Sequence, residues 1–289
     1  MLFPEARRAV EASAGDTPVY SEDYDIEAAR AEARRLAAEE PREDVAAVED
    51  VDADGVPARL YTPDAAAPGA IVHAHGGGFA LNDVEVHDAA ARRLANRAGR
   101  RVLSVEYRLP PEHRFPAAVD DVIAAGGWAE ATIGGPLAVH GDSAGANLAL
   151  VAALRDPERF RAVALVYPFL DPTAGFDSYR TAADGFDPRE ASWYWQQYAA
   201  GPDDLTDPDL APLLSDRLGT LPPTLVITAE HDPLRDEGEE LARRLAEAGV
   251  EVTATRYLGQ VHGFWRHPRA FSAAEPANRQ VAGFLRLHG

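Results

Sequence analysis

A serine flanked by small residues is the first feature of the sequence that could do chemistry. Ser143 is the centre of Gly-Asp-Ser-Ala-Gly at positions 141–145, which fits the pattern G-x-S-x-G. The segment follows an apolar run, 137–140, and precedes a helix-prone run, 146–154. Glycines at both ends allow a tight strand-to-helix turn that exposes the serine hydroxyl at the top of a sheet. A plain glycine-rich turn fits the same pattern, but the flanking elements favour a nucleophile.

A run of glycines is the second such feature. His75-Gly76-Gly77-Gly78-Phe79 follows the apolar run 70–74. Because glycines carry no side chain, their backbone N–H groups can converge on an oxygen that becomes negative during a reaction. We predict that the amides of Gly77, Gly78 and Ala144 form an oxyanion hole. The alternative, a phosphate-binding loop, lacks the G-x-x-x-x-G-K-[ST] spacing, and the chain contains no lysine.

A serine hydroxyl needs a base that takes its proton, and the base needs an acid that holds its tautomer. His262 lies in a loop just after the apolar run 251–257, where a base could reach the top of the sheet, and we predict that it is the base. The other histidines beyond the serine are less suitable, since His231 adjoins the best acid, His267 precedes a proline and His288 is next to the terminus.

The acid is predicted to be Asp232, which comes directly after the apolar run 224–229. Asp236 and Glu237 are expected in the first turn of the next helix, where the helix dipole favours negative charge. Glu230 is the rival, because a glutamate can serve in the same role.

The overall composition excludes several classes of function. The 289 residues include no cysteine, so disulfides and thiolate chemistry are absent, and the net charge of −19 argues against nucleic acid. No apolar run could cross a membrane, and the charged first residues do not form a signal peptide, so we predict a cytoplasmic protein. We expect no metal site, since His73 and His75 share a strand face without a third ligand. All 28 cationic residues are arginine, which fits either GC-rich coding or adaptation to high salt.

The chain alternates between apolar runs and helix-prone stretches, which is typical of a mostly parallel sheet covered by helices on both faces. An antiparallel hairpin, Val45–Val51 and Val56–Tyr61, comes first, with its turn at 52–55. The predicted strands after it are Ala70–His75, Arg101–Tyr107, Pro136–Gly141, Ala162–Tyr167, Thr224–Ala229 and Glu251–Tyr257. The predicted helices between them are Val86–Ala98, Ala117–Ala131, Ala144–Leu154 and Arg235–Ala248.

One long segment interrupts this alternation. Residues 170–222 are rich in proline, aspartate and aromatic residues, and compact domains rarely contain a structureless stretch of this length. We predict an inserted helical cap there, packed with the helix-prone N-terminal segment 24–40. The predicted organisation is an N-terminal cap segment, 1–44, a catalytic domain made of 45–169 and 223–289, and an inserted cap segment, 170–222.

Four aromatic residues are predicted to line a substrate pocket, because they lie near the reactive segments or in the cap. They are Phe79, Trp193, Tyr194 and Phe264. The alternative for each is ordinary packing in the core.

Taken together, the motifs resemble the bacterial hormone-sensitive-lipase family of esterases, in the family's order and over roughly 200 residues. The matching segments are HGGGF at 75–79, Tyr107-Arg108-Leu109, Pro111–Ala118 with Asp121, GDSAG at 141–145, Asp232–Asp236 and His262-Gly263-Phe264. The resemblance implies an α/β-hydrolase fold with an eight-stranded sheet and a helical cap. It also implies a carboxylesterase for short- to medium-chain esters, with no cofactor and often a homodimer. Asn82, Pro110 and Ala146 depart from the family's usual Gly, Ala and Gly, which should alter the mouth of the pocket.

The same residues would serve other substrates. An amide, a lactone or an acetylated natural product could be cleaved by the same serine, histidine and aspartate. A non-catalytic receptor on this scaffold is a further alternative, against which the presence of both Ser143 and His262 argues.

Overall fold

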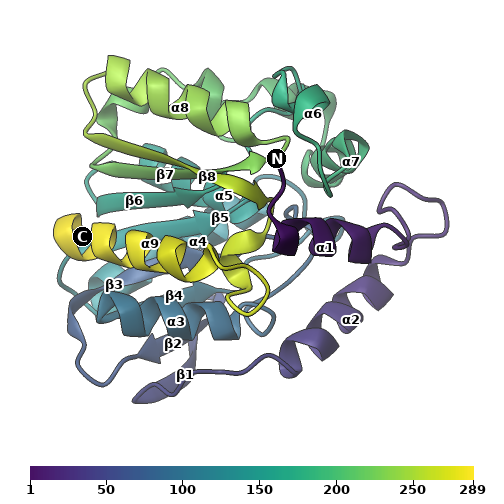
Figure 1. The fold of residues 1–289 in the computed structure, drawn as a ribbon. Helices are drawn as coiled ribbons and strands as arrows, with labels where there is room; N and C mark the ends of the chain where they lie inside the picture. Colours follow the sequence, from purple (N-terminus) through teal and green to yellow (C-terminus); the bar gives the residue numbers. More distant parts are fainter.

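The computed structural model describes all residues, 1–289, and it is built around one eight-stranded sheet (Figure 1). The strand order is β1-β2-β4-β3-β5-β6-β7-β8. The strands are β1 (Ala47–Asp52), β2 (Pro57–Thr62), β3 (Ala67–Ala74), β4 (Arg100–Val105), β5 (Leu137–Asp142), β6 (Phe160–Val166), β7 (Thr224–His231) and β8 (Val252–Val261). Every strand predicted from the sequence is present, within a few residues of its expected bounds.

The sheet is antiparallel at one edge and parallel elsewhere. β1 pairs with β2 and β2 with β4 in antiparallel register, which confirms the predicted hairpin. From β4 to β8 every pairing is parallel. The carboxyl ends of the parallel strands therefore meet at one edge of the sheet, where residues from distant parts of the chain come together. The mostly parallel α/β fold is confirmed.

Helices cover both faces of the sheet and enclose two hydrophobic cores. One face is covered by α4 (Ala117–Thr132), α5 (Ala144–Arg155) and α8 (Arg235–Glu247). The other is covered by α3 (Asp88–Ala98) and α9 (Ala274–His288), which lie side by side in Figure 1. Helix α9 is not among the elements predicted from the sequence, and its burial of Ala274, Val281 and Leu285 completes the second core. No helix of the protein is both long and apolar enough to cross a membrane.

Four further α-helices lie above the carboxyl ends of the parallel strands. They are α1 (Pro4–Ser13), which the sequence patterns did not indicate, α2 (Ile26–Ala38), α6 (Ser178–Thr181) and α7 (Pro188–Tyr198), followed by the short 3₁₀ turns η1 (Pro202–Thr206), η2 (Pro212–Leu214) and η3 (Leu218–Thr220). In the view of Figure 1, α1 lies between α2 below it and the helices α6 and α7 above it. The Tyr20 hydroxyl donates to Asp187 over 3.0 Å, and the rings of Tyr24 and Trp193 meet edge to face at 5.7 Å. The N-terminal segment thus contacts the inserted one.

Candidate active site

Ser143 lies at a sharp turn between β5 and α5. Its backbone has φ 56° and ψ −121°, a strained conformation for a residue with a side chain. A Cβ added to Gly141 would lie 2.1 Å from the carbonyl oxygen of Gly145, and one added to Gly145 would lie 2.1 Å from that of Ala74. No side chain fits at either glycine, which is the reason the G-x-S-x-G pattern has glycines at its ends.

His262 connects Ser143 to Asp232. The imidazole Nε2 lies 3.0 Å from the Ser143 hydroxyl oxygen, and Nδ1 lies 2.8 Å from a carboxylate oxygen of Asp232. The other carboxylate oxygen of Asp232 accepts the Leu234 N–H at 2.9 Å. Because a carboxylate accepts the proton on Nδ1, Nε2 is left with its lone pair toward the serine. The structure therefore brings the three predicted residues together in the order that a catalytic triad requires.

The rival residues lie elsewhere. Glu230 accepts the Gly259 N–H at 2.7 Å, so its carboxylate is engaged by the backbone of strand β8. His231 is paired with Asp184 of the inserted segment at 2.7 Å. Asp236 and Glu237 occupy the first turn of α8, as expected from the sequence.

The glycine loop has free amides where an oxyanion hole needs them. The N–H groups of Gly77, Gly78 and Ala144 donate to no protein acceptor. By contrast the Gly76 N–H donates to Asp142 at 3.0 Å. Asp142 precedes the nucleophile, so this bond ties the glycine loop to the serine turn. The structure thus leaves the three predicted amides available and engages their neighbour.

The carbonyls of the glycine loop are also held. The Tyr107 hydroxyl donates to the His75 carbonyl at 2.6 Å, and the Asn82 side-chain amide donates to the Gly76 carbonyl at 3.0 Å. Tyr194 from α7 covers the loop, since a Cβ on Gly78 would lie 2.1 Å from its ring.

A cavity of ≈ 380 Å³ opens above Ser143 and His262. It is lined by the glycine loop, by Asn82, by the inserted segment and by α1. The lining residues outside the triad and the glycines include Ala9, Val10, Ser13, Asn82, Asp142, Tyr167, Phe169, Phe186, Glu190, Tyr194, Arg266, His267 and Phe271. Its volume lies toward the lower end of the roughly 300–1,000 Å³ typical of small-molecule sites.

A family model of the α/β-hydrolase fold matches residues 71–266, which include Ser143, Asp232 and His262. The chain belongs to this α/β-hydrolase family. A carboxylic ester hydrolase, LipN, of Mycobacterium tuberculosis is 38% identical over 92% of this chain and 77% of its own. An ethyl acetate hydrolase of Pseudomonas putida is 35% identical over 82% of this chain and 80% of its own.

The solved structures agree with this assignment. A hyperthermophilic esterase from the archaeon Pyrobaculum calidifontis superposes with a TM-score of 0.90, at 36% identity over 99% of this chain and 98% of the other. Together with the curated relatives this confirms the resemblance to the hormone-sensitive-lipase family. This α/β-hydrolase is a carboxylesterase that acts on small-molecule esters.

Three of the four predicted pocket aromatics lie outside the cavity of this hydrolase, and only Tyr194 lines it. Phe79 adopts φ 65°, which turns its buried ring into the core, where it stacks on Tyr198 at 3.9 Å. Phe264 is also fully buried and packs against Tyr257. Trp193 contacts Tyr24 of the N-terminal segment instead. Phe79 and Phe264 therefore pack in the core, and Trp193 packs between the N-terminal and inserted segments.

Several cavity residues of the hydrolase were not predicted from the sequence. The Tyr167 ring lies 4.5 Å from that of His262. Tyr167 directly follows strand β6, and this position at a strand end could have indicated a place in the site. Phe186 also faces His262, with ring centroids 5.0 Å apart. Glu190 lies in the same cavity, and burial raises the pKa of its carboxyl group. Val10 belongs to α1, for which no sequence pattern indicated a place in the site.

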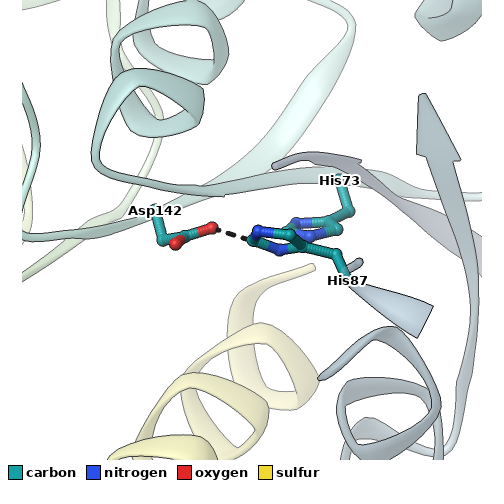
Figure 2. Close-up of side chains that lie close together, drawn as sticks. All are labelled: His73, His87 and Asp142. Carbon is teal, nitrogen blue, oxygen red and sulfur yellow. Dashed lines mark ion pairs between the residues drawn. The ribbon is translucent and has the colours of Figure 1, made fainter. Parts of the chain in front are cut away.

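A buried cluster of His73, His87 and Asp142 lies beneath the serine turn, and Figure 2 shows the His87 ring directed at the Asp142 carboxylate. The His87 Nδ1 is 3.7 Å from that carboxylate. Arg266 donates to the His87 Nε2 at 2.8 Å, and a guanidinium can only donate. The proton of neutral His87 must then lie on Nδ1, which removes the lone pair that a metal ion would need. The arrangement favours a polar network over a metal site.

Burial dominates the electrostatics of this cluster. It lowers the pKa of His73 and His87 well below the usual value, and lowers that of the neighbouring His140 to about 3. Burial also raises the pKa of Asp142 to about 6, against the opposing effects of Arg266 and the Gly76 N–H. The histidines are therefore neutral at pH 7, and Asp142 carries the negative charge that the Gly76 amide stabilises.

Proposed function

We propose that Ser143, His262 and Asp232 hydrolyse esters through an acyl-enzyme, with Gly77, Gly78 and Ala144 as the oxyanion hole. The observation that carries this proposal is the continuous chain of contacts from Asp232 through His262 to Ser143, at 2.8 and 3.0 Å.

The proposed first step forms the acyl-enzyme. Ser143 Oγ attacks the ester carbonyl carbon while its proton passes to His262 Nε2, and the three amides donate to the resulting oxyanion. The tetrahedral intermediate collapses, the bond from carbon to the alcohol oxygen breaks, and His262 returns the proton to the departing alcohol.

The second step releases the acid. Water gives a proton to His262 and its oxygen attacks the acyl carbon, after which the bond to Ser143 breaks and the serine recovers its proton. Asp232 stays ionised throughout and stabilises the imidazolium that forms twice in the cycle.

We also propose a preference for short- to medium-chain acyl groups. The cavity of ≈ 380 Å³ supports it, since a long acyl chain would have to leave the enclosed space. The tetrahedral centre would lie near Phe186 and Tyr194, so these side chains are placed to contact the acyl or the alcohol part.

The proposed domain division follows from the same cavity. Segments 1–44 and 170–222 are proposed to form the cap together, and 45–169 with 223–289 the catalytic domain. Val10 from the first segment and Phe186 from the second both line the cavity. Location in the cytoplasm and homodimerisation remain part of the proposal, and light scattering on the purified protein would test the latter.

A panel of p-nitrophenyl esters from acetate to palmitate tests mechanism and chain length together. Ser143→Ala should lose about 10⁶-fold in kcat while keeping its circular dichroism spectrum and its melting temperature. A p-nitrophenyl phosphonate should label the wild type once, at Ser143, by mass spectrometry. An active Ser143→Ala variant, or labelling at another residue, would contradict the proposed mechanism.

A further inference from the structure

The Gly76 carbonyl and the Gly77 N–H belong to one peptide unit. Because that unit is planar and trans, its C=O and N–H point in opposite directions. Whatever fixes the carbonyl therefore fixes the direction of the N–H. In this protein the carbonyl accepts a hydrogen bond from Asn82 Nδ2 at 3.0 Å. The Gly77 N–H itself has no protein acceptor, so it is free to serve a ligand in the cavity.

The neighbouring peptide units are held by other groups. The His75–Gly76 peptide unit is fixed at both ends. Its carbonyl accepts from the Tyr107 hydroxyl at 2.6 Å, and its N–H donates to Asp142 at 3.0 Å. The Gly77–Gly78 peptide unit is fixed by the backbone, since the Leu81 N–H donates to the Gly77 carbonyl at 2.8 Å. The Gly76–Gly77 unit between them is held only at its carbonyl, by Asn82 and by the His75 Nδ1, which lies 3.1 Å from the Gly76 oxygen. Of these two groups only Asn82 also lines the cavity.

Glycine backbone does not fix this unit by itself. Gly77 has φ 134°, a region that only glycine enters readily, and glycine moves between conformations at little cost. A rotation of the unit would turn the Gly77 N–H away from the cavity without moving the triad. A hydrogen bond to the carbonyl opposes that rotation.

Asn82 is well suited to this position. Its backbone has φ 65°, a left-handed conformation that asparagine tolerates better than most residues. Its side chain is half-buried and lines the cavity, and its Nδ2 lies 2.9 Å from where a Cβ on Gly77 would stand. The position is one of the three at which the sequence departs from the family it resembles.

We propose that Asn82 is a positioning residue for ester hydrolysis, holding the Gly76–Gly77 peptide so that the Gly77 N–H faces the oxyanion. The inference rests on the proposed function, since it assigns the purpose of this amide. Asn82 touches no reacting atom and acts only through the peptide. Its effect is expected in the transition state, because the substrate carbonyl gains its negative charge there.

The test compares Asn82→Gly with Asn82→Asp on p-nitrophenyl butyrate. Glycine accepts φ 65° without strain but has no amide, and aspartate keeps the size of the side chain while its ionised carboxylate cannot donate. Both variants should lose about 10- to 100-fold in kcat, with KM within about threefold of the wild-type value. The expected loss is smaller than the 10²- to 10³-fold in kcat that removal of one oxyanion donor typically costs, because the Gly77 N–H is still present.

A transition-state readout separates positioning from a general loss of structure. An alkyl trifluoromethyl ketone adds the Ser143 oxygen to its carbonyl, with the proton passing to His262, and leaves an oxyanion in the hole. Its inhibition constant should rise in both variants by the same factor by which kcat falls. An unchanged kcat, or a loss seen only in KM, would overturn the assignment of Asn82.

Measurements on the wild-type protein distinguish a failure of the Asn82 assignment from a failure of the proposed function. If wild-type protein fails to hydrolyse esters and the phosphonate does not label Ser143, the proposed function is wrong. If the wild type is active and labelled, and Asn82→Gly has an unchanged kcat and ketone affinity, only the role of Asn82 is wrong.

Discussion

The catalytic loops and the cap face the same cavity, but different interactions hold them. The loops are fixed by buried hydrogen bonds between side chains and backbone, in which the Tyr107 hydroxyl donates to the His75 carbonyl and the Gly76 N–H donates to Asp142. The N-terminal and inserted segments, proposed to form the cap, meet through contacts that are only partly buried, such as Tyr20 with Asp187. Polar pairs that stay open to solvent contribute little to stability. The difference suggests that the chemistry is fixed by the core, whereas substrate choice depends on side chains that can change at low cost.

Asp232→Asn tests the core half of this comparison with the largest expected effect. The amide can donate toward His262, which would favour the wrong tautomer, so kcat should fall by about 10⁴-fold with little change in KM. The measurement is steady-state hydrolysis of p-nitrophenyl butyrate. Glu230→Gln is the matched control, since Glu230 binds the Gly259 amide, and it should retain full activity. A larger loss in the control would make Glu230 the acid.

Gly78→Ala tests where the two regions touch. The added methyl group would lie 2.1 Å from the Tyr194 ring, at a backbone φ of 58°. We expect kcat to fall about 10²- to 10³-fold, because the Gly78 amide would move away from the oxyanion. The double variant with Tyr194→Ala should recover part of the loss if the clash is its cause. No recovery would assign the loss to the strained backbone alone.

His140→Gln tests how the buried core beside the site responds to acid. Burial lowers the pKa of His140 to about 3, whereas the unfolded chain takes up this proton near pH 6.5. The unfolded state therefore binds more protons below pH 6.5, and the stability present at neutral pH is lost as the pH falls toward 3. Between pH 7 and pH 5, His140 should lower the free energy of unfolding by about 2 kcal/mol.

Urea unfolding at each pH measures this effect. The free energy of unfolding of the wild type should fall by about 2 kcal/mol more than that of His140→Gln between pH 7 and pH 5. A difference between the two proteins that stays constant from pH 7 to pH 5 would mean that the protonation of His140 is not linked to unfolding.

Phe186→Ala tests the role of the proposed cap in substrate choice, and it has the smallest expected effect. Removing the Phe186 ring, which lies 5.0 Å from that of His262, widens the cavity and leaves the three triad side chains themselves unchanged. We expect kcat/KM for acetate to fall by less than about tenfold and the preferred acyl chain to lengthen, since one methylene is worth about 1–3 kcal/mol in such pockets. Trp193→Ala should leave the chain-length profile unchanged, because its ring contacts Tyr24.

The meeting of Ser143, Asp232 and His262 could be predicted from the sequence because each of the three residues follows the end of a predicted strand. Parallel strands bring those ends to one edge, so Asp232 and His262 meet Ser143 although they are far apart in the chain. The strand order, and the hydrogen bonds that hold the carbonyls of the glycine loop, required the structure.

The direction of side chains could not be predicted in the same way. Phe79 follows the glycine loop, yet a left-handed backbone turns its ring into the core. The sequence singled out Asn82 only because it departs from the family's usual residue. Its hydrogen bond to the Gly76 carbonyl depends on how the chain turns after the glycine loop. The part played by α1 depends on a long-range contact, in which Phe3 packs against Gly259 of β8.

The contact between Tyr194 and Gly78 also constrains how this enzyme can diverge. A side chain at position 78 can appear only after residue 194 has become smaller, so the two positions should covary among relatives. Transplanting a cap from another esterase would bring a different residue to position 194. Such a chimaera should need position 78 exchanged together with the cap, although position 78 lies in the segment proposed as the catalytic domain.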